Sequence, residues 1–138
     1  MGEVTGGGAL DDLSAQKTYK WSKFKCVKVA WAITLDYKVA LDRLDNNLRR
    51  GIVRAKDKRL MHTLDASSSL AYKAGDWAAL GDHEEANRLM HRAYSVWNQC
   101  RISLGLKEIF YGSIPENATR YFLERKAKID TLKKKAAR

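Results

Sequence analysis

The sequence predicts an all-α fold: a single antiparallel bundle of four to five helices behind a flexible, Gly-rich N-terminal tail. Pro115 is the only proline in 138 residues, so long helices can form without the break that proline imposes. Apolar residues recur at spacings of three and four, which places them on one face of a helix. A hydrophobic content of 45% is enough for one packed core. We therefore expect one domain.

The chain begins with a Gly-rich segment that has no apolar periodicity. This composition predicts a flexible tail over residues 1–12 and a helical domain over residues 13–138. The segment 17–35 fits two patterns, an alternation typical of a strand and a helical stripe that includes Trp21, Phe24 and Trp31. A strand needs a partner, and no second convincing strand follows. Helix is therefore the prediction.

A clear helical pattern begins at Asp36. We expect this helix to continue toward Leu60 or His62, with a bend or a close helix crossing near Gly51, because glycine weakens a helix by about 1 kcal/mol relative to alanine. The residues predicted to share its apolar face are Tyr37, Leu41, Leu44, Leu48 and Ile52.

The segment 63–100 contains a pattern of small and apolar residues, with a turn at Gly81-Asp82. The residues in this pattern are Leu70, Ala74, Trp77, Gly81, Ala86, Met90 and Ala93. Over residues 66–97, about a quarter of the chain, this spacing resembles a single tetratricopeptide-type helical hairpin. Asp82 is expected to cap the second helix in a capping box with Glu85. No second copy follows, so the resemblance implies a helical hairpin and not a peptide-binding repeat array.

The second helix of the hairpin is expected to end near Gly105, and a last helix follows a short apolar connection. Its predicted start has Ser113 as the N-cap, Pro115 in the first turn and Glu116 at the third position. The residues that this helix is expected to bury are Ala118, Tyr121, Phe122, Ile129 and Leu132.

Catalytic and metal-binding patterns are missing from the sequence. His83-Glu84 begins like the zinc motif His-Glu-x-x-His, but Asn87 occupies the position of the second histidine. Cys26 and Cys100 are expected on packed helix faces, where cysteine behaves as a small apolar residue. We therefore predict no enzyme, no metal site and no cofactor. The apolar runs are too short to span a bilayer, and a cytoplasmic location is expected, or a virion if the protein is viral.

The formal net charge of +10 is concentrated in three runs. Clustered cations of this kind are typical of a protein that binds a polyanion. We expect folding to gather the runs into one continuous strip, with Tyr19 as an exposed aromatic on which a base can stack. The predicted nucleic-acid-binding residues are Lys17, Lys20, Lys23, Lys25 and Lys28 in the first run, Arg49, Arg50, Arg54, Lys56, Lys58 and Arg59 in the second, and Lys126, Lys133, Lys134 and Lys135 in the third.

These observations favour a non-enzymatic subunit that binds the backbone of a nucleic acid within a larger nucleoprotein assembly. A small subunit of a ribonucleoprotein effector and a viral nucleoprotein or coat both fit. The expected partners are RNA or a single strand, bound without sequence preference, and other protein subunits or further copies of the chain. The alternative is a scaffold or matrix-type module that binds a partner protein through Trp77 and Trp97, or an anionic membrane surface. The sequence does not distinguish RNA from DNA as the ligand, or a cellular from a viral origin of the protein.

Overall fold

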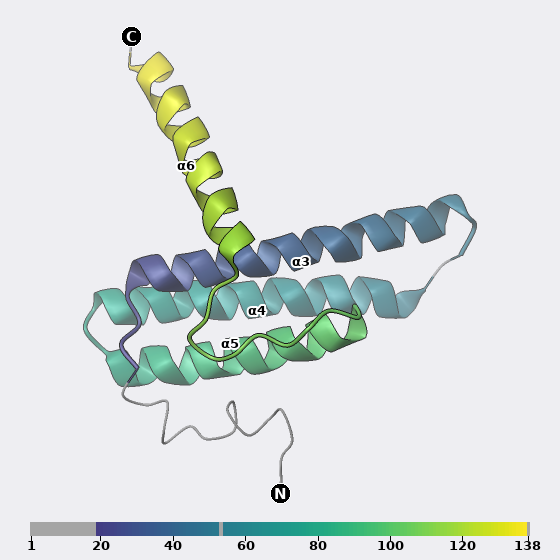
Figure 1. Ribbon diagram of the computed structural model, residues 1–138, viewed down its shortest axis with the longest axis horizontal. Helices are drawn as coiled ribbons and strands as arrows, with labels where there is room; N and C mark the ends of the chain where they lie inside the picture. The colour runs from purple at the N-terminus through teal and green to yellow at the C-terminus, as the bar shows by residue number, and fades with distance from the viewer. Residues whose placement is uncertain (1–18, 53, 138) are drawn as a thin grey trace, which may run out of the picture.

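The computed structural model describes residues 19–52 and 54–137, and within them the chain forms four α-helices and no strand. Helices α3 (Lys23–Arg49), α4 (Ala55–Ala79) and α5 (His83–Ser103) lie side by side in antiparallel order (Figure 1). Helix α6 (Glu116–Ala136) starts beside α3 and points away from the other three. The all-α prediction is confirmed, while the predicted tail, residues 1–12, lies outside the described residues.

Helix α3 confirms the helical interpretation for residues 23–35 of the ambiguous segment 17–35, whereas residues 19–22 precede the helix and residues 17–18 lie outside the described residues. Ser22 caps it, because its Oγ accepts a hydrogen bond from the Lys25 backbone N–H at 3.1 Å. The predicted apolar face is partly wrong, since Leu41 and Leu48 are exposed and Ala40 turns toward the core. The buried residues Asp36, Ala40 and Asn47 each precede a predicted position by one residue, so the buried face is rotated around the helix from the predicted one. The buried residues of α3 are Cys26, Val29, Ala30, Ala32, Ile33, Asp36, Ala40, Leu44 and Asn47.

The end of α3 differs from the prediction. The helix stops at Arg49 and does not continue toward Leu60, because Gly51 adopts a left-handed conformation with a φ of 74°. The Ile52 N–H then donates to the Asn47 carbonyl at 2.8 Å, which closes the last turn. The predicted bend is therefore a complete reversal of the chain.

Helices α4 and α5 form the predicted hairpin. Gly81 has a φ of 87°, and Asp82 Oδ1 accepts from the Glu85 N–H at 3.1 Å. The second hydrogen bond of the predicted capping box, from the Asp82 N–H to the Glu85 carboxylate, is wrong, because this N–H donates to the Trp77 carbonyl. The Glu85 carboxylate instead forms two hydrogen bonds with Arg88, at 2.6 and 2.8 Å.

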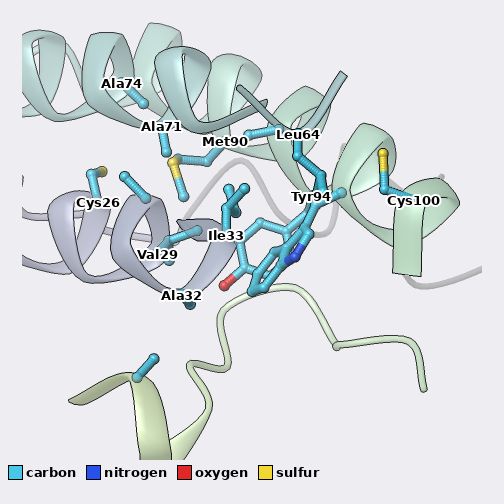
Figure 2. Packing of buried hydrophobic residues seen from close by; sticks show 14 of the residues in the cluster. Cys26, Val29, Ala32, Ile33, Leu64, Ala71, Ala74, Met90, Tyr94 and Cys100 are labelled. Carbon is cyan, nitrogen blue, oxygen red and sulfur yellow. The ribbon is translucent and has the colours of Figure 1, made fainter. Parts of the chain in front are cut away.

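The core lies between α3, α4 and α5, whose buried side chains point toward one another (Figure 2). Small residues let α4 approach α3 closely: a Cβ on Gly75 would lie only 3.2 Å from Cys26 Cβ. Larger side chains on α5, among them Met90, Tyr94 and Trp97, fill the space that these small residues leave.

The connection from α5 to α6 is held against the body by buried polar groups. Asn98 forms two hydrogen bonds with the Ile109 backbone, at 2.9 and 2.8 Å. The Tyr94 hydroxyl donates to the Ser113 carbonyl, and Trp21 Nε1 donates to the Tyr111 hydroxyl at 2.9 Å. These contacts fix the place at which α6 begins.

The predicted start of α6 is wrong in its details. Pro115 is the N-cap residue and Glu116 the first helical residue, while Ser113 Oγ donates backwards to the Phe110 carbonyl at 2.9 Å. Ser113 lies two residues before the cap, so its hydroxyl does not serve the helix.

Helix α6 contacts the body through its first turns alone. Ala118 and Phe122 are buried and Tyr121 is half-buried. The predicted burial of Ile129 and Leu132 is wrong, because they are 40% and 58% exposed where α6 has left the body (Figure 1).

Candidate functional site

The three basic runs lie in three different places. The first run lies at the start of α3, with Lys17 outside the described residues, and the second lies at the turn from α3 to α4 and in the first turn of α4. Their nearest members, Lys28 and Arg49, both lie on α3, and the helical rise places them about 30 Å apart. The third run lies on the projecting part of α6. The expectation of one continuous strip is therefore wrong for the first two runs.

Those cations of the runs that the structure describes are exposed, except for Lys28, which is half-buried. Within residues 19–52 and 54–137, two of them form ion pairs, Lys23 with Asp76 at 3.8 Å and Arg49 with Asp45 at 3.2 Å. Both pairs are exposed to solvent, which weakens them. Most of the predicted binding residues that the structure describes therefore present their charge to solvent outside any ion pair.

An open cleft of about 470 Å³ lies where the end of α3, the start of α4 and the end of α5 meet. We call it the basic cleft. Its lining residues are Arg43, Lys56, Asp57, Arg59, Leu60, Thr63, Gln99, Cys100 and Ser103.

The basic cleft is built from residues on three helices. Lys56, Arg59 and Thr63 follow one another at helical spacing on α4 and so share one side of it. Arg43 on α3 reaches across to α5, where its guanidinium donates to the carbonyls of Ser103 at 3.4 Å and Leu104 at 3.2 Å. Sequence reasoning missed Arg43 because it belongs to none of the three runs. Its neighbours Asp42 and Asp45 made it resemble part of an ordinary solvated face.

The electrostatics of the basic cleft favour an anion. Asp57 also lines the cleft, but it is 2% exposed and its Oδ2 accepts from Asn47 Nδ2 at 3.0 Å, while Lys56 and Arg59 are exposed. The first turn of α4 adds the positive end of a helix dipole, and its N-cap residue, Arg54, forms no side-chain cap. Burial raises the pKa of the Cys100 thiol, which keeps that group uncharged at neutral pH.

Tyr19, the predicted stacking residue, is half-buried in an aromatic cluster. Its ring centroid lies 4.7 Å from that of Trp21, and its hydroxyl donates to the Gly112 carbonyl at 3.3 Å. Lys25 Nζ lies 5.3 Å from the centre of the same ring. The face of Tyr19 is thus shared with a cation of the first run, and stacking on it stays a prediction.

Other aromatic residues differ from expectation. Phe24, which the predicted helical stripe groups with Trp21, is 51% exposed, with Lys28 Nζ 5.2 Å from its ring centre and an edge contact to Phe122. Trp97, expected to offer an exposed face, is fully buried, whereas Trp77 is 41% exposed. The reason is that Trp97 faces the contact between α5 and α3, a placement that depends on tertiary packing.

Within the described ranges, no group of three or more His, Cys, Asp or Glu is arranged to hold a metal ion. Over the same ranges, none of the helices combines the length and the apolar character that crossing a membrane requires. Comparison with protein-family models, curated proteins and solved structures finds no match to this chain. The resemblance to a tetratricopeptide-type hairpin stays a prediction.

Proposed function

We propose that the protein binds the phosphate backbone of a nucleic acid, without catalysis and without sequence preference, as a subunit of a larger nucleoprotein assembly. The observation that supports this most directly is the basic cleft, in which Arg43, Lys56 and Arg59 converge from two helices. Two of these three cations belong to the second run, so a local surplus of charge coincides with a concave surface. Phosphate groups are the anions that such a surface binds in a polyanion.

Backbone recognition fits this surface better than reading of bases. The cations lie on exposed, flexible side chains, which contact phosphates but do not by themselves select a base. RNA and single-stranded DNA are the proposed ligands. The proposed settings are a ribonucleoprotein effector or a viral nucleoprotein or coat, in the cytoplasm or in a virion.

The test compares two double variants of equal charge. Lys56→Gln/Arg59→Gln removes two cations of the basic cleft, and Lys73→Gln/Arg92→Gln removes two exposed cations that lie outside the cleft and outside the three runs. Affinity for a fluorescent single-stranded oligonucleotide is measured by anisotropy over a range of salt concentrations. The cleft variant should lower the slope of log Kobs against log salt by about 1.4, since each lost phosphate contact contributes about 0.7 for a single strand.

The control variant should leave that slope close to the wild-type value. Equal slopes for the two double variants would contradict the assignment of the cleft, because net charge alone would then explain binding. No measurable binding at low salt would contradict the function itself.

A second candidate function, attachment to a partner protein or to further copies of the chain, is supported by α6. Leu123, Ile129 and Leu132 are 54%, 40% and 58% exposed on a helix that leaves the body. Exposed apolar residues on a projecting helix favour contact with another surface. Lys133, Lys134 and Lys135 follow them, so an anionic membrane is a variant of this candidate. Sedimentation of the purified chain, alone and with anionic vesicles, separates self-association from membrane binding.

A further inference from the structure

A second hollow, of about 170 Å³, lies between α3, α4 and α6, away from the basic cleft. That volume equals about five or six water molecules. We call it the aromatic pocket. Its lining residues are Trp31, Thr34, Tyr72, Tyr121 and Arg125.

Three aromatic rings from three helices converge on this pocket. Trp31 is held by edge contacts with Tyr121, at 5.7 Å between ring centres, and with Phe122, at 5.0 Å. Tyr72 is 44% exposed and makes no ring contact with another described residue. Trp31 and Tyr121 therefore support each other within the lining, and Tyr72 on α4 adds a ring that is partly exposed to solvent.

The polar groups of the pocket indicate what kind of ligand it takes. Arg125 is exposed and forms no ion pair within residues 19–52 and 54–137, so the pocket disfavours a cationic ligand such as a quaternary ammonium group. The Thr34 hydroxyl donates to the Ala30 carbonyl at 3.0 Å, which leaves its oxygen free to accept a hydrogen bond. A flat ring with N–H groups and an attached anion matches this combination.

We propose that the aromatic pocket binds one unstacked nucleobase of a single strand, with Tyr72 stacking on the base and Arg125 contacting an adjacent phosphate. The inference rests on the proposed function and adds single-strand selectivity to it. Aromatic side chains bind bases of a single strand by stacking, with little sequence preference. In a duplex the bases are paired and stacked on one another, and they do not enter a pocket of this kind.

The pocket also lies close to cations of the first run. Phe122, which packs on Trp31, contacts Phe24, and Lys28 Nζ lies over the Phe24 ring. Arg125 in the pocket and Lys28 near it are thus two cations that can contact the phosphates flanking a bound base.

The experiment compares oligouridylate with an abasic oligomer of the same length and charge. The wild-type protein should bind oligouridylate more tightly, by a factor on the order of ten, because stacking on an aromatic side chain contributes that much per base. Tyr72→Ala should remove this difference without weakening the binding of the abasic oligomer. Trp77→Ala, which removes a similarly exposed aromatic from the same helix outside the pocket, should preserve it.

The results distinguish the pocket from the function on which it rests. Equal wild-type affinity for the two oligomers overturns the pocket and leaves backbone binding intact, whereas failure to bind either oligomer overturns both. The pocket is also overturned if Trp77→Ala abolishes the difference in affinity between oligouridylate and the abasic oligomer while Tyr72→Ala preserves it. Photocrosslinking with 5-iodouridine gives an independent measurement: the crosslink should map to Trp31, Tyr72 or Tyr121, and a crosslink confined to residues outside the pocket overturns the assignment.

Discussion

At the scale of single residues, Asp36 is one of two buried carboxylates among the described residues, the other being Asp57. Asp36 is 6% exposed, and its Oδ2 accepts from Trp97 Nε1 and from Arg101 Nη1, both at 2.7 Å. Arg101 Nε also donates to the Lys107 carbonyl. This carboxylate thus joins α3, the end of α5 and the connection toward α6, and it holds the end of α5 that forms one wall of the basic cleft.

Replacement of Asp36 should destabilise the protein strongly. Asp36→Ala leaves the indole N–H of Trp97 and the guanidinium of Arg101 without their acceptor, and loss of one partner of a buried ion pair costs about 3 kcal/mol or more. Urea unfolding followed by circular dichroism measures the change. Asp45→Ala breaks the exposed pair with Arg49 and should cost no more than about 0.5 kcal/mol. Similar losses in the two variants would contradict the structural role of Asp36.

The buried thiol of Cys26 should make the free energy of unfolding depend on pH. Burial raises the pKa of its thiol from the ordinary value of 9.0 to about 12. Between these values the unfolded chain has lost the thiol proton while the folded chain retains it. The free energy of unfolding should therefore fall as the pH rises through this window.

The measurement compares urea midpoints at about pH 8 and about pH 10 in the wild type and in Cys26→Ala. The drop should be smaller in the variant, whose unfolded chain lacks this thiol. The two proteins differ at this position alone, so the difference between the two drops reports the contribution of Cys26. An equal drop in both proteins would show that Cys26 does not contribute.

At the scale of elements, local chemistry decided what the sequence could predict. The turn at Gly81-Asp82 was predictable because a glycine and a capping aspartate together define a helix end and the next start. Gly51 was ambiguous, because glycine is tolerated within a helix and is also the usual residue after one. The sequence could not predict which half of α6 is buried. Apolar residues recur regularly along the whole helix, and only tertiary packing decides that its first half is buried and its second half exposed.

We expect the first half of α6 to anchor the helix to the body, and the second half to contribute nothing to the stability of the body. A chain truncated after Arg125 keeps Ala118 and Phe122, the buried residues of α6, so its urea midpoint should match that of the full chain. Phe122→Ala removes the ring that packs on Phe24 and Trp31 and should detach the whole helix. Hydrogen exchange of the α6 amides reports the detachment. Marked destabilisation by the truncation would contradict this division.

At the scale of the whole molecule, the candidate contact surfaces are spread over its length. The first run lies at one end of α3 and the basic cleft toward the other, with Lys28 and Arg43 about 20 Å apart along this helix. The runs themselves were visible in the sequence. The cleft was not, because Arg43, Lys56 and Gln99 are distant in sequence and converge only when the three helices pack. A nucleic acid that contacts both ends must therefore extend along the body.

This separation predicts that oligonucleotide length decides which cations matter. On a strand long enough to span α3, Lys20→Gln/Lys25→Gln and Lys56→Gln/Arg59→Gln should each lower the salt slope, and the quadruple variant should lower it by the sum, because distant sites act independently. On a strand much shorter than α3, the two reductions should not add, since each bound strand reaches one end. Titrations of both lengths over a range of salt concentrations measure the slopes. If Lys20→Gln/Lys25→Gln leaves the slope on the long strand unchanged, the first run is not part of the binding surface, and the strand is held at the cleft alone.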